Sequence, residues 1–157
     1  MKTLIIYASK YGCVADCATD LKSKLSGDVT LVDVKKMDKD LDLDNFETII
    51  IGGSVYIGNI AKELKSFCRG NLELLCRKKL GLFLCCGQVD QANEFFENNF
   101  QLRLLKHAQI TECFGGEARP EKMNLVDSSL LKAVTKGDFS SFEILDKNIE
   151  KFAEAFN

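Results

Sequence analysis

The sequence predicts an α/β fold, a doubly wound five-stranded parallel sheet in three layers with the strand order 2-1-3-4-5. Apolar runs of strand length alternate with stretches of helical periodicity along the whole chain. The first of these runs is apolar at consecutive positions, which is typical of a parallel strand buried on both faces. The length of 157 residues suits one domain, and we expect residues 1–157 to form it.

The N-terminal third contains two expected strands with a helix between them. Residues 3–8 form the continuous apolar run and predict the first strand. Residues 14–25 place apolar side chains at helical spacing, and Gly27 follows where a helix C-cap is expected. Residues 29–34 predict the second strand. Four aspartates between residues 38 and 44 then indicate a solvated connection.

The alternation continues through the rest of the chain. Three further strands are expected at residues 46–51, 80–86 and 109–114, and glycine follows each of them. Helical periodicity predicts helices at residues 61–76, 91–105, 125–134 and 142–156. The segment 117–138 is longer than a simple loop, and it fits either a helix packed on the sheet edge or a contact with a partner or a membrane surface.

Charge and composition exclude several classes of function. The chain has 21 basic and 23 acidic residues and a net charge of −2, which argues against a protein that binds nucleic acid through a basic field. No apolar stretch is long enough to span a bilayer, and the N-terminus lacks a signal-peptide pattern. Seven cysteines without a secretory signal predict free thiols in a reducing cytoplasm. With a single histidine and no C-x-x-C, we expect no metal site.

Three loops follow the first, third and fourth strands, where sheets of this order bind ligands. In the first loop, residues 9–13, the start of a helix offers unpaired N–H groups to an anion, and Ser9, Lys10 and Gly12 can add a hydroxyl, a charge and close backbone approach. In the second loop, residues 53–59, a planar ring could lie against Tyr56. The third loop, residues 87–91, offers backbone donors to the edge of such a ring.

Together these loops resemble the flavodoxin family. The resemblance lies in LIIYASKYG at residues 4–12, IIGGSVYIG at residues 50–58, and the Cys86-Gly87 pair. It is strongest for the branch that includes menaquinone-dependent protoporphyrinogen oxidase. It implies bound flavin mononucleotide (FMN), with phosphate on residues 9–14 and the ring between the second and third loops. The cofactor-binding residues it implies are Ser9, Lys10, Tyr11, Gly12, Cys13, Val14, Ser54, Val55, Tyr56, Ile57, Gly58, Cys86, Gly87, Gln88 and Asp90.

The resemblance implies electron transfer by the flavin, with a redox partner protein or a small-molecule donor or acceptor. The sequence departs from the family at Tyr11, Cys13 and Val14, where flavodoxins usually carry hydroxyl residues in the phosphate loop. No aromatic residue stands in the third loop to cover the outer face of the ring. An FMN-dependent oxidoreductase acting on a quinone or a protoporphyrinogen-type substrate is therefore an alternative to an electron carrier.

Two alternatives rest on cysteines. Cys113 and Arg119 fit C-x-x-G-x-x-R, which resembles the phosphate cradle of cysteine-dependent phosphatases. A redox-sensing thiol site or an iron–sulfur cluster could use Cys13, Cys17, Cys85 and Cys86. Cys13 is expected at a helix N-terminus, which lowers a thiol pKa. Because Cys85 and Cys86 are adjacent on a strand and point to opposite faces, we expect that all four thiols do not converge.

Overall fold

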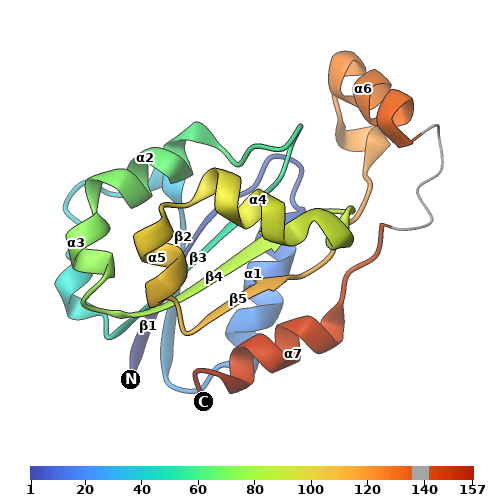
Figure 1. The fold of residues 1–157 in the computed structure, drawn as a ribbon. Coiled ribbons are helices and arrows are strands. Elements are labelled where there is room, and N and C mark those ends of the chain that lie inside the picture. The colour runs from blue at the N-terminus through green and yellow to red at the C-terminus, as the bar shows by residue number, and fades with distance from the viewer. Residues whose placement is uncertain (136–141) are drawn as a thin grey trace.

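The structure is a computed structural model and describes residues 1–135 and 142–157. Its centre is a five-stranded parallel sheet with the order β2-β1-β3-β4-β5, as predicted (Figure 1). The strands are β1 (Lys2–Ala8), β2 (Asp28–Asp33), β3 (Thr48–Ser54), β4 (Lys79–Cys85) and β5 (Ile110–Cys113). The order reverses beside β1, so the carboxyl ends of β1, β3 and β4 lie next to one another.

Helices cover both faces of the sheet. The α-helices are α1 (Cys13–Lys24), α2 (Lys62–Gly70), α3 (Leu72–Leu75), α4 (Ala92–Asn99), α5 (Leu102–His107), α6 (Leu125–Thr135) and α7 (Asp146–Glu154). Short 3-10 turns are η1 (Val34–Lys36), η2 (Leu43–Asn45), η3 (Val89–Gln91) and η4 (Pro120–Lys122). Helices α1 and α7 pack on one face, and α2 to α5 pack on the other (Figure 1).

The two hydrophobic cores follow from the alternation of side chains along each strand. Leu4 and Ile6 of β1 face the core under α2 to α5, whereas Ile5 between them faces α1 and α7. All three are fully buried, which confirms that β1 is covered on both faces. On the α1 side, Phe83 and Phe114 stack with ring centroids 4.4 Å apart, and Phe152 of α7 meets both edge-on.

Three expected helices are shorter or more broken than the periodicity predicts. The helix expected at 61–76 divides at Asn71, whose backbone and side-chain nitrogens both donate to the carbonyl of Phe67. The helix expected at 91–105 divides at Phe100 and Gln101, which have extended backbone angles. The helix expected at 142–156 begins only at Asp146, because residues 143–145 bond to the backbone after β5 instead.

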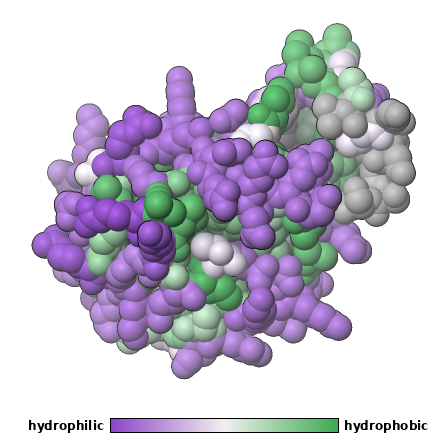
Figure 2. Space-filling model, viewed as in Figure 1, coloured by the Kyte–Doolittle hydropathy of each residue, from purple (hydrophilic) through white to green (hydrophobic). Residues whose placement is uncertain are grey.

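Helix α6 lies outside the layers and confirms the helix expected at 125–134 (Figure 1). Apolar side chains on it remain exposed, with 84% of Leu125 and 67% of Val126 open to solvent, and the space-filling view shows this apolar surface (Figure 2). Residues 136–138 of the segment 117–138 lie outside the described residues. Among the described residues, no helix has the length and apolar character needed to cross a bilayer.

Candidate functional site

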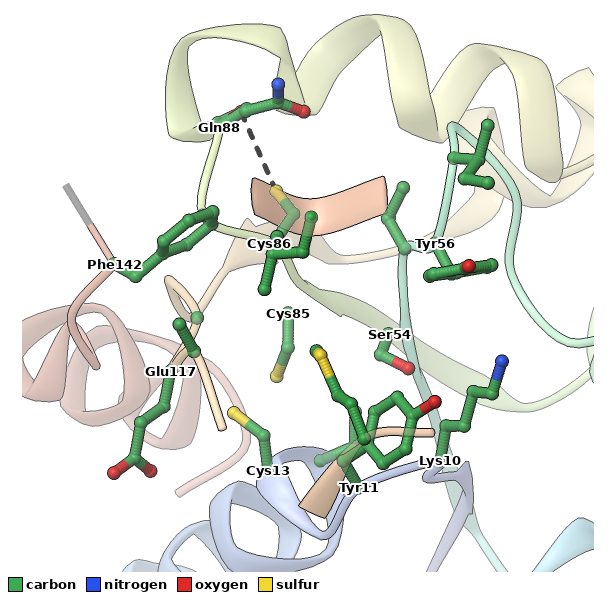
Figure 3. Close-up of a pocket in the computed structure, with 18 of the residues that line it drawn as sticks. Lys10, Tyr11, Cys13, Ser54, Tyr56, Cys85, Cys86, Gln88, Glu117 and Phe142 are labelled. Atoms are coloured by element: carbon green, nitrogen blue, oxygen red, sulfur yellow. Dashed lines mark hydrogen bonds between the residues drawn. The ribbon is translucent and has the colours of Figure 1, made fainter. Parts of the chain in front are cut away.

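A cavity of about 280 Å³ opens at the carboxyl ends of β1, β3 and β4. The loops that follow these strands form its sides, and residues 116–118, Met123, α6 and Phe142 complete it (Figure 3). Its lining is mainly apolar, with Val14, Val55, Leu130 and Leu131 among the contributors. A largely apolar hollow with a few polar groups at the switch point of a parallel sheet is a typical ligand site.

The first loop connects β1 to α1 through a tight turn. Gly12 has a φ of +92°, which side chains other than glycine rarely adopt, and it caps the N-terminus of α1. Its N–H donates to Ser9 Oγ over 3.1 Å, and its carbonyl accepts the Asp16 N–H at 3.0 Å. Cys13 and Val14 then begin the helix, whose first-turn N–H groups lack acceptors within the helix. The cavity thus borders a helix N-terminus that favours an anion.

Asp127 of α6 links the first two loops. Its carboxylate accepts hydrogen bonds from the hydroxyls of Tyr11 and Tyr56, and Lys10 Nζ lies 2.6 Å from it. The ammonium of Lys10 also lies 4.2 Å from the centre of the Tyr56 ring. The bonds from Lys10, Tyr11 and Tyr56 lower the pKa of Asp127 to about 2, and the bond to Asp127 raises the pKa of Lys10. These contacts hold α6 against the cavity as an ionised network.

The second loop is a reverse turn. The backbone N–H and carbonyl groups of Tyr56 and Asn59 pair with each other, and Ile57 and Gly58 between them both have positive φ. Ile57 has a φ of +48° and is 66% exposed. A β-branched residue in this region is strained, because its side chain crowds the backbone. The turn therefore presents an exposed apolar side chain at the cavity at a cost in backbone energy.

The third loop supplies little side-chain bulk of its own. A Cβ on Gly87 would lie 1.3 Å from the ring of Phe142, so only glycine allows this contact. The absence of an aromatic residue in the loop is therefore offset by a residue from a distant segment, and Figure 3 shows the Phe142 ring beside Cys86 at the cavity. The Cys86 sulfur lies 3.7 Å from the carbonyl oxygen of Gln88 and 3.4 Å from the sulfur of Cys113.

Two groups of cysteine thiols lie near the cavity, a pair at Cys86 and Cys113 and a group of three at Cys13, Cys17 and Cys85. Contact with Cys113 and burial raise the pKa of Cys86, whereas the hydrogen bond from Cys86 lowers the pKa of Cys113 to about 7. On the other face, the sulfurs of Cys13, Cys17 and Cys85 lie within 4.8 Å of one another. The thiols of Cys17 and Cys85 donate to Cys13 and lower its pKa to about 3. As expected, Cys86 does not join this group, but the other three cysteines do converge.

The phosphatase alternative does not fit the structure. A phosphate cradle after Cys113 would need free backbone N–H groups and an arginine facing them. The N–H groups of Phe114 and Gly116 donate instead to the carbonyls of Leu84 and Glu143. Arg119 is held by Asp16 and Glu117, each 2.7 Å away, and also donates to the carbonyl of Tyr11. Cys113 is buried, with 3% of the residue exposed, and its sulfur contacts that of Cys86.

The structure brings most of the expected cofactor residues to one cavity. The residues that line it are Ser9, Lys10, Tyr11, Cys13, Val14, Ser54, Val55, Tyr56, Ile57, Gly58, Cys86, Gly87 and Gln88. Gly12 shapes the turn without lining the cavity, and Asp90 is exposed in η3 away from it. The sequence analysis did not identify Asp127 or Phe142, and it named Cys85 only as a thiol and not as a residue of the cofactor cavity. The alternation of strand side chains could have placed Cys85 on the α1 face, whereas no local pattern indicates Asp127.

Comparisons with known proteins agree with this architecture. A family model described as a flavodoxin domain matches residues 4–142. The chain is similar to the structure of an archaeal flavodoxin, with 15% identity, a TM-score of 0.55 and coverage of 99% of both chains. It is also similar to a flavodoxin, WrbA-like protein from Agrobacterium tumefaciens, with 17% identity, a TM-score of 0.58 and coverage of 99% of this chain and 96% of that one.

A third similar structure is rubredoxin oxygen:oxidoreductase from Desulfovibrio gigas, with 14% identity and a TM-score of 0.57. The match covers 99% of this chain but only 36% of that one, so the chain spans about a third of that protein. The search of curated proteins returned no match. At these identities the structural likeness shows the fold, and the family model adds the sequence evidence. Because that model spans most of the chain, the protein belongs to the flavodoxin-domain family.

Proposed function

We propose that this protein binds FMN in the cavity and transfers electrons. The observation that carries the proposal is that three loops of the flavodoxin-domain pattern meet around one apolar cavity that borders the N-terminus of α1. When bound, FMN supplies the redox chemistry by accepting and donating one or two electrons. The protein would bind and orient the cofactor, and a redox partner protein or a small molecule would supply and remove the electrons.

The residues present fit the two ends of the cofactor. The first-turn N–H groups of α1 and the ammonium of Lys10 suit a phosphate. The rings of Tyr56 and Phe142 and the side chains of Val55 and Leu130 suit a flat, largely apolar ring system. Asp127 bonds to Lys10, so a phosphate and this carboxylate would compete for one ammonium group.

The test compares FMN with riboflavin, which lacks the phosphate. We expect the recombinant chain to be yellow, or to take up FMN with quenching of flavin fluorescence. Lys10→Ala should weaken FMN binding by about fivefold to tenfold and leave riboflavin binding nearly unchanged, because the lost interaction is a partly solvated charge contact. Lys62→Ala, at an exposed position in α2, is the matched control. Colourless protein without uptake at high micromolar FMN would refute the proposal.

We propose as a second candidate an FMN-dependent oxidoreductase of the protoporphyrinogen oxidase branch, acting on a quinone or a protoporphyrinogen-type substrate. The observation that favours it is the exposed apolar surface of Leu125 and Val126 on the helix that borders the cavity. A lipid-soluble substrate could reach the cavity across such a surface. Rapid reoxidation of the reduced protein by a menaquinone analogue, lost in a Leu125→Gln and Val126→Gln double variant, would support this activity; a rate equal to that of free reduced flavin would exclude it.

A further inference from the structure

The three thiols on the α1 side of the sheet form a compact donor set. Cys13 is the first residue of α1, Cys17 lies one turn later, and Cys85 is the last residue of β4. Helical residues four apart lie on the same face, so both cysteines of α1 face the end of β4. Figure 3 shows the sulfurs of Cys13 and Cys85 directed toward one another at the floor of the cavity.

The spacing of the sulfurs fits a single bound ion. All three Sγ atoms lie within 4.8 Å of one another. With metal–sulfur bonds of about 2.3 Å, three sulfurs around one ion in a plane lie about 4 Å apart. The observed separations therefore need to close by less than about 1 Å, which side-chain rotation can supply. Among the described residues, this is the only group of three or more cysteine, histidine or acidic side chains with such spacing.

The nature of the donors selects the kind of ion. Sulfur ligands favour soft ions such as Cu(I) and disfavour Mg²⁺, Ca²⁺ and Mn²⁺, which prefer oxygen. Structural zinc sites take four ligands, and within the described chain no fourth ligand of these types joins the group. Cu(I) accepts three sulfur ligands. The positive end of α1 offsets thiolate charge at the site, and a backbone hydrogen bond from Glu117 and the charge of Arg119 both stabilise ionised Cys13.

We propose that Cys13, Cys17 and Cys85 form a binding site for one Cu(I) ion with three sulfur ligands. The site is shielded from water, since Cys13 is 9% exposed and the other two are each 3% exposed. Cys13 and Cys85 also border the cavity, which gives an ion a route to the thiols. Cu(I) binding at this site requires no flavin, so its test does not depend on whether the protein binds FMN.

The experiment titrates the reduced 157-residue chain with Cu(I) under anaerobic conditions, in competition with the chromophoric chelator bicinchoninate. We expect one Cu(I) per chain, with three sulfur neighbours in the X-ray absorption spectrum. Each of Cys13→Ser, Cys17→Ser and Cys85→Ser should weaken binding by at least about tenfold, because loss of a direct ligand costs no less than loss of an outer-shell partner. Alanine variants at the same positions, checked by circular dichroism, separate loss of a ligand from loss of the fold.

Two control variants make the test specific. Cys68→Ser changes a cysteine that is equally buried, at 1% exposed, but belongs to the opposite core, and it should leave Cu(I) binding unchanged. Cys86→Ser disrupts the contact between the thiols of Cys86 and Cys113. It should also leave Cu(I) binding unchanged. The proposal would be overturned if the chain retained no Cu(I) against bicinchoninate, or if Cu(I) binding survived the replacement of Cys13, Cys17 and Cys85 together by serine. Tighter binding of Zn²⁺ than of Cu(I) by the same three thiols would also overturn it.

Discussion

Replacing Gly12 by alanine probes the turn on which the cavity is built. At a φ of +92°, an L-residue crowds its own backbone, and the left-handed region costs about 1–2 kcal/mol. The added Cβ would also lie 2.8 Å from Nη1 of Arg119, and this end of the side chain would have to shift away from the carbonyl of Tyr11, to which it donates. We therefore expect Gly12→Ala to lower the free energy of unfolding by about 1–2 kcal/mol, which for this chain length lowers the Tm by about 2–8 °C.

Two other glycines provide matched controls for thermal unfolding followed by circular dichroism. Gly58 has a φ of +75° and no heavy atom within 4 Å of an added Cβ, so Gly58→Ala measures the backbone strain alone. Gly70 at the end of α2 has neither positive φ nor a close neighbour, and Gly70→Ala should not destabilise the protein. The difference between Gly12→Ala and Gly58→Ala then reports the cost of displacing Arg119.

The same variant links the turn to the proposed cofactor. Because Gly12 sets the direction in which α1 begins, its replacement should weaken FMN binding more than riboflavin binding. A Gly12→Ala variant that unfolds at the wild-type temperature, while Gly58→Ala shows the expected loss, would contradict the strain assigned to Gly12. In that case the positive φ of Gly12 would not describe the turn in solution.

Three further predictions concern other parts of the site. Asp127→Asn should raise the ratio of FMN to riboflavin affinity by about twofold to fivefold, because Lys10 is freed from its carboxylate partner; an unchanged ratio would show that the two anions do not compete. The stabilisation that wild type has over Asp127→Asn should be constant above about pH 5, decline between about pH 4 and pH 2, and be lost below the folded pKa, since the folded pKa is about 2 and the unfolded pKa is about 3.9; unfolding by urea across this range measures it. Ile57→Asn should raise the Tm by about 2–4 °C, because asparagine tolerates positive φ and the side chain is exposed; an equal or lower Tm would contradict the assigned strain.

The sheet could be predicted from the sequence because its signals are local. The continuous apolar run in β1 and the glycine that closely follows β4 both reflect burial and turn chemistry within a few residues, whereas Gly52 and Gly53, expected after the third strand, lie within β3. The breaks in the helices were not predicted because apolar periodicity runs through both of them, although Gly70 and Asn71 are residues that commonly end a helix. Asn71 ends α2 by bonding to Phe67, and Phe100 and Gln101 interrupt the next helix without proline or glycine.

The candidate site was predictable where it consists of loops and not where it depends on distant contacts. The segments at Ser9–Val14 and after β3 carry recognisable patterns, and the structure brings them to one cavity. Asp127 contacts Tyr11 across 116 residues of sequence, and Phe142 packs on Gly87 from beyond β5. The cysteine group lies between these cases, since helical spacing pairs Cys13 with Cys17 but only the packing of α1 on β4 adds Cys85.

The order of the sheet also bears on how the protein resists aggregation. The open edges belong to β2 and β5, and a strand edge can recruit a strand from another molecule. Strand β2 begins at Asp28 and ends at Asp33, and β5 is only four residues long and carries Glu112, which pairs with Lys151 at 2.9 Å. Growth of the sheet at either edge would bring these ionised groups against a second backbone. Charge and shortness at its edges thus disfavour the pairing of this apolar sheet with the edge of a second copy.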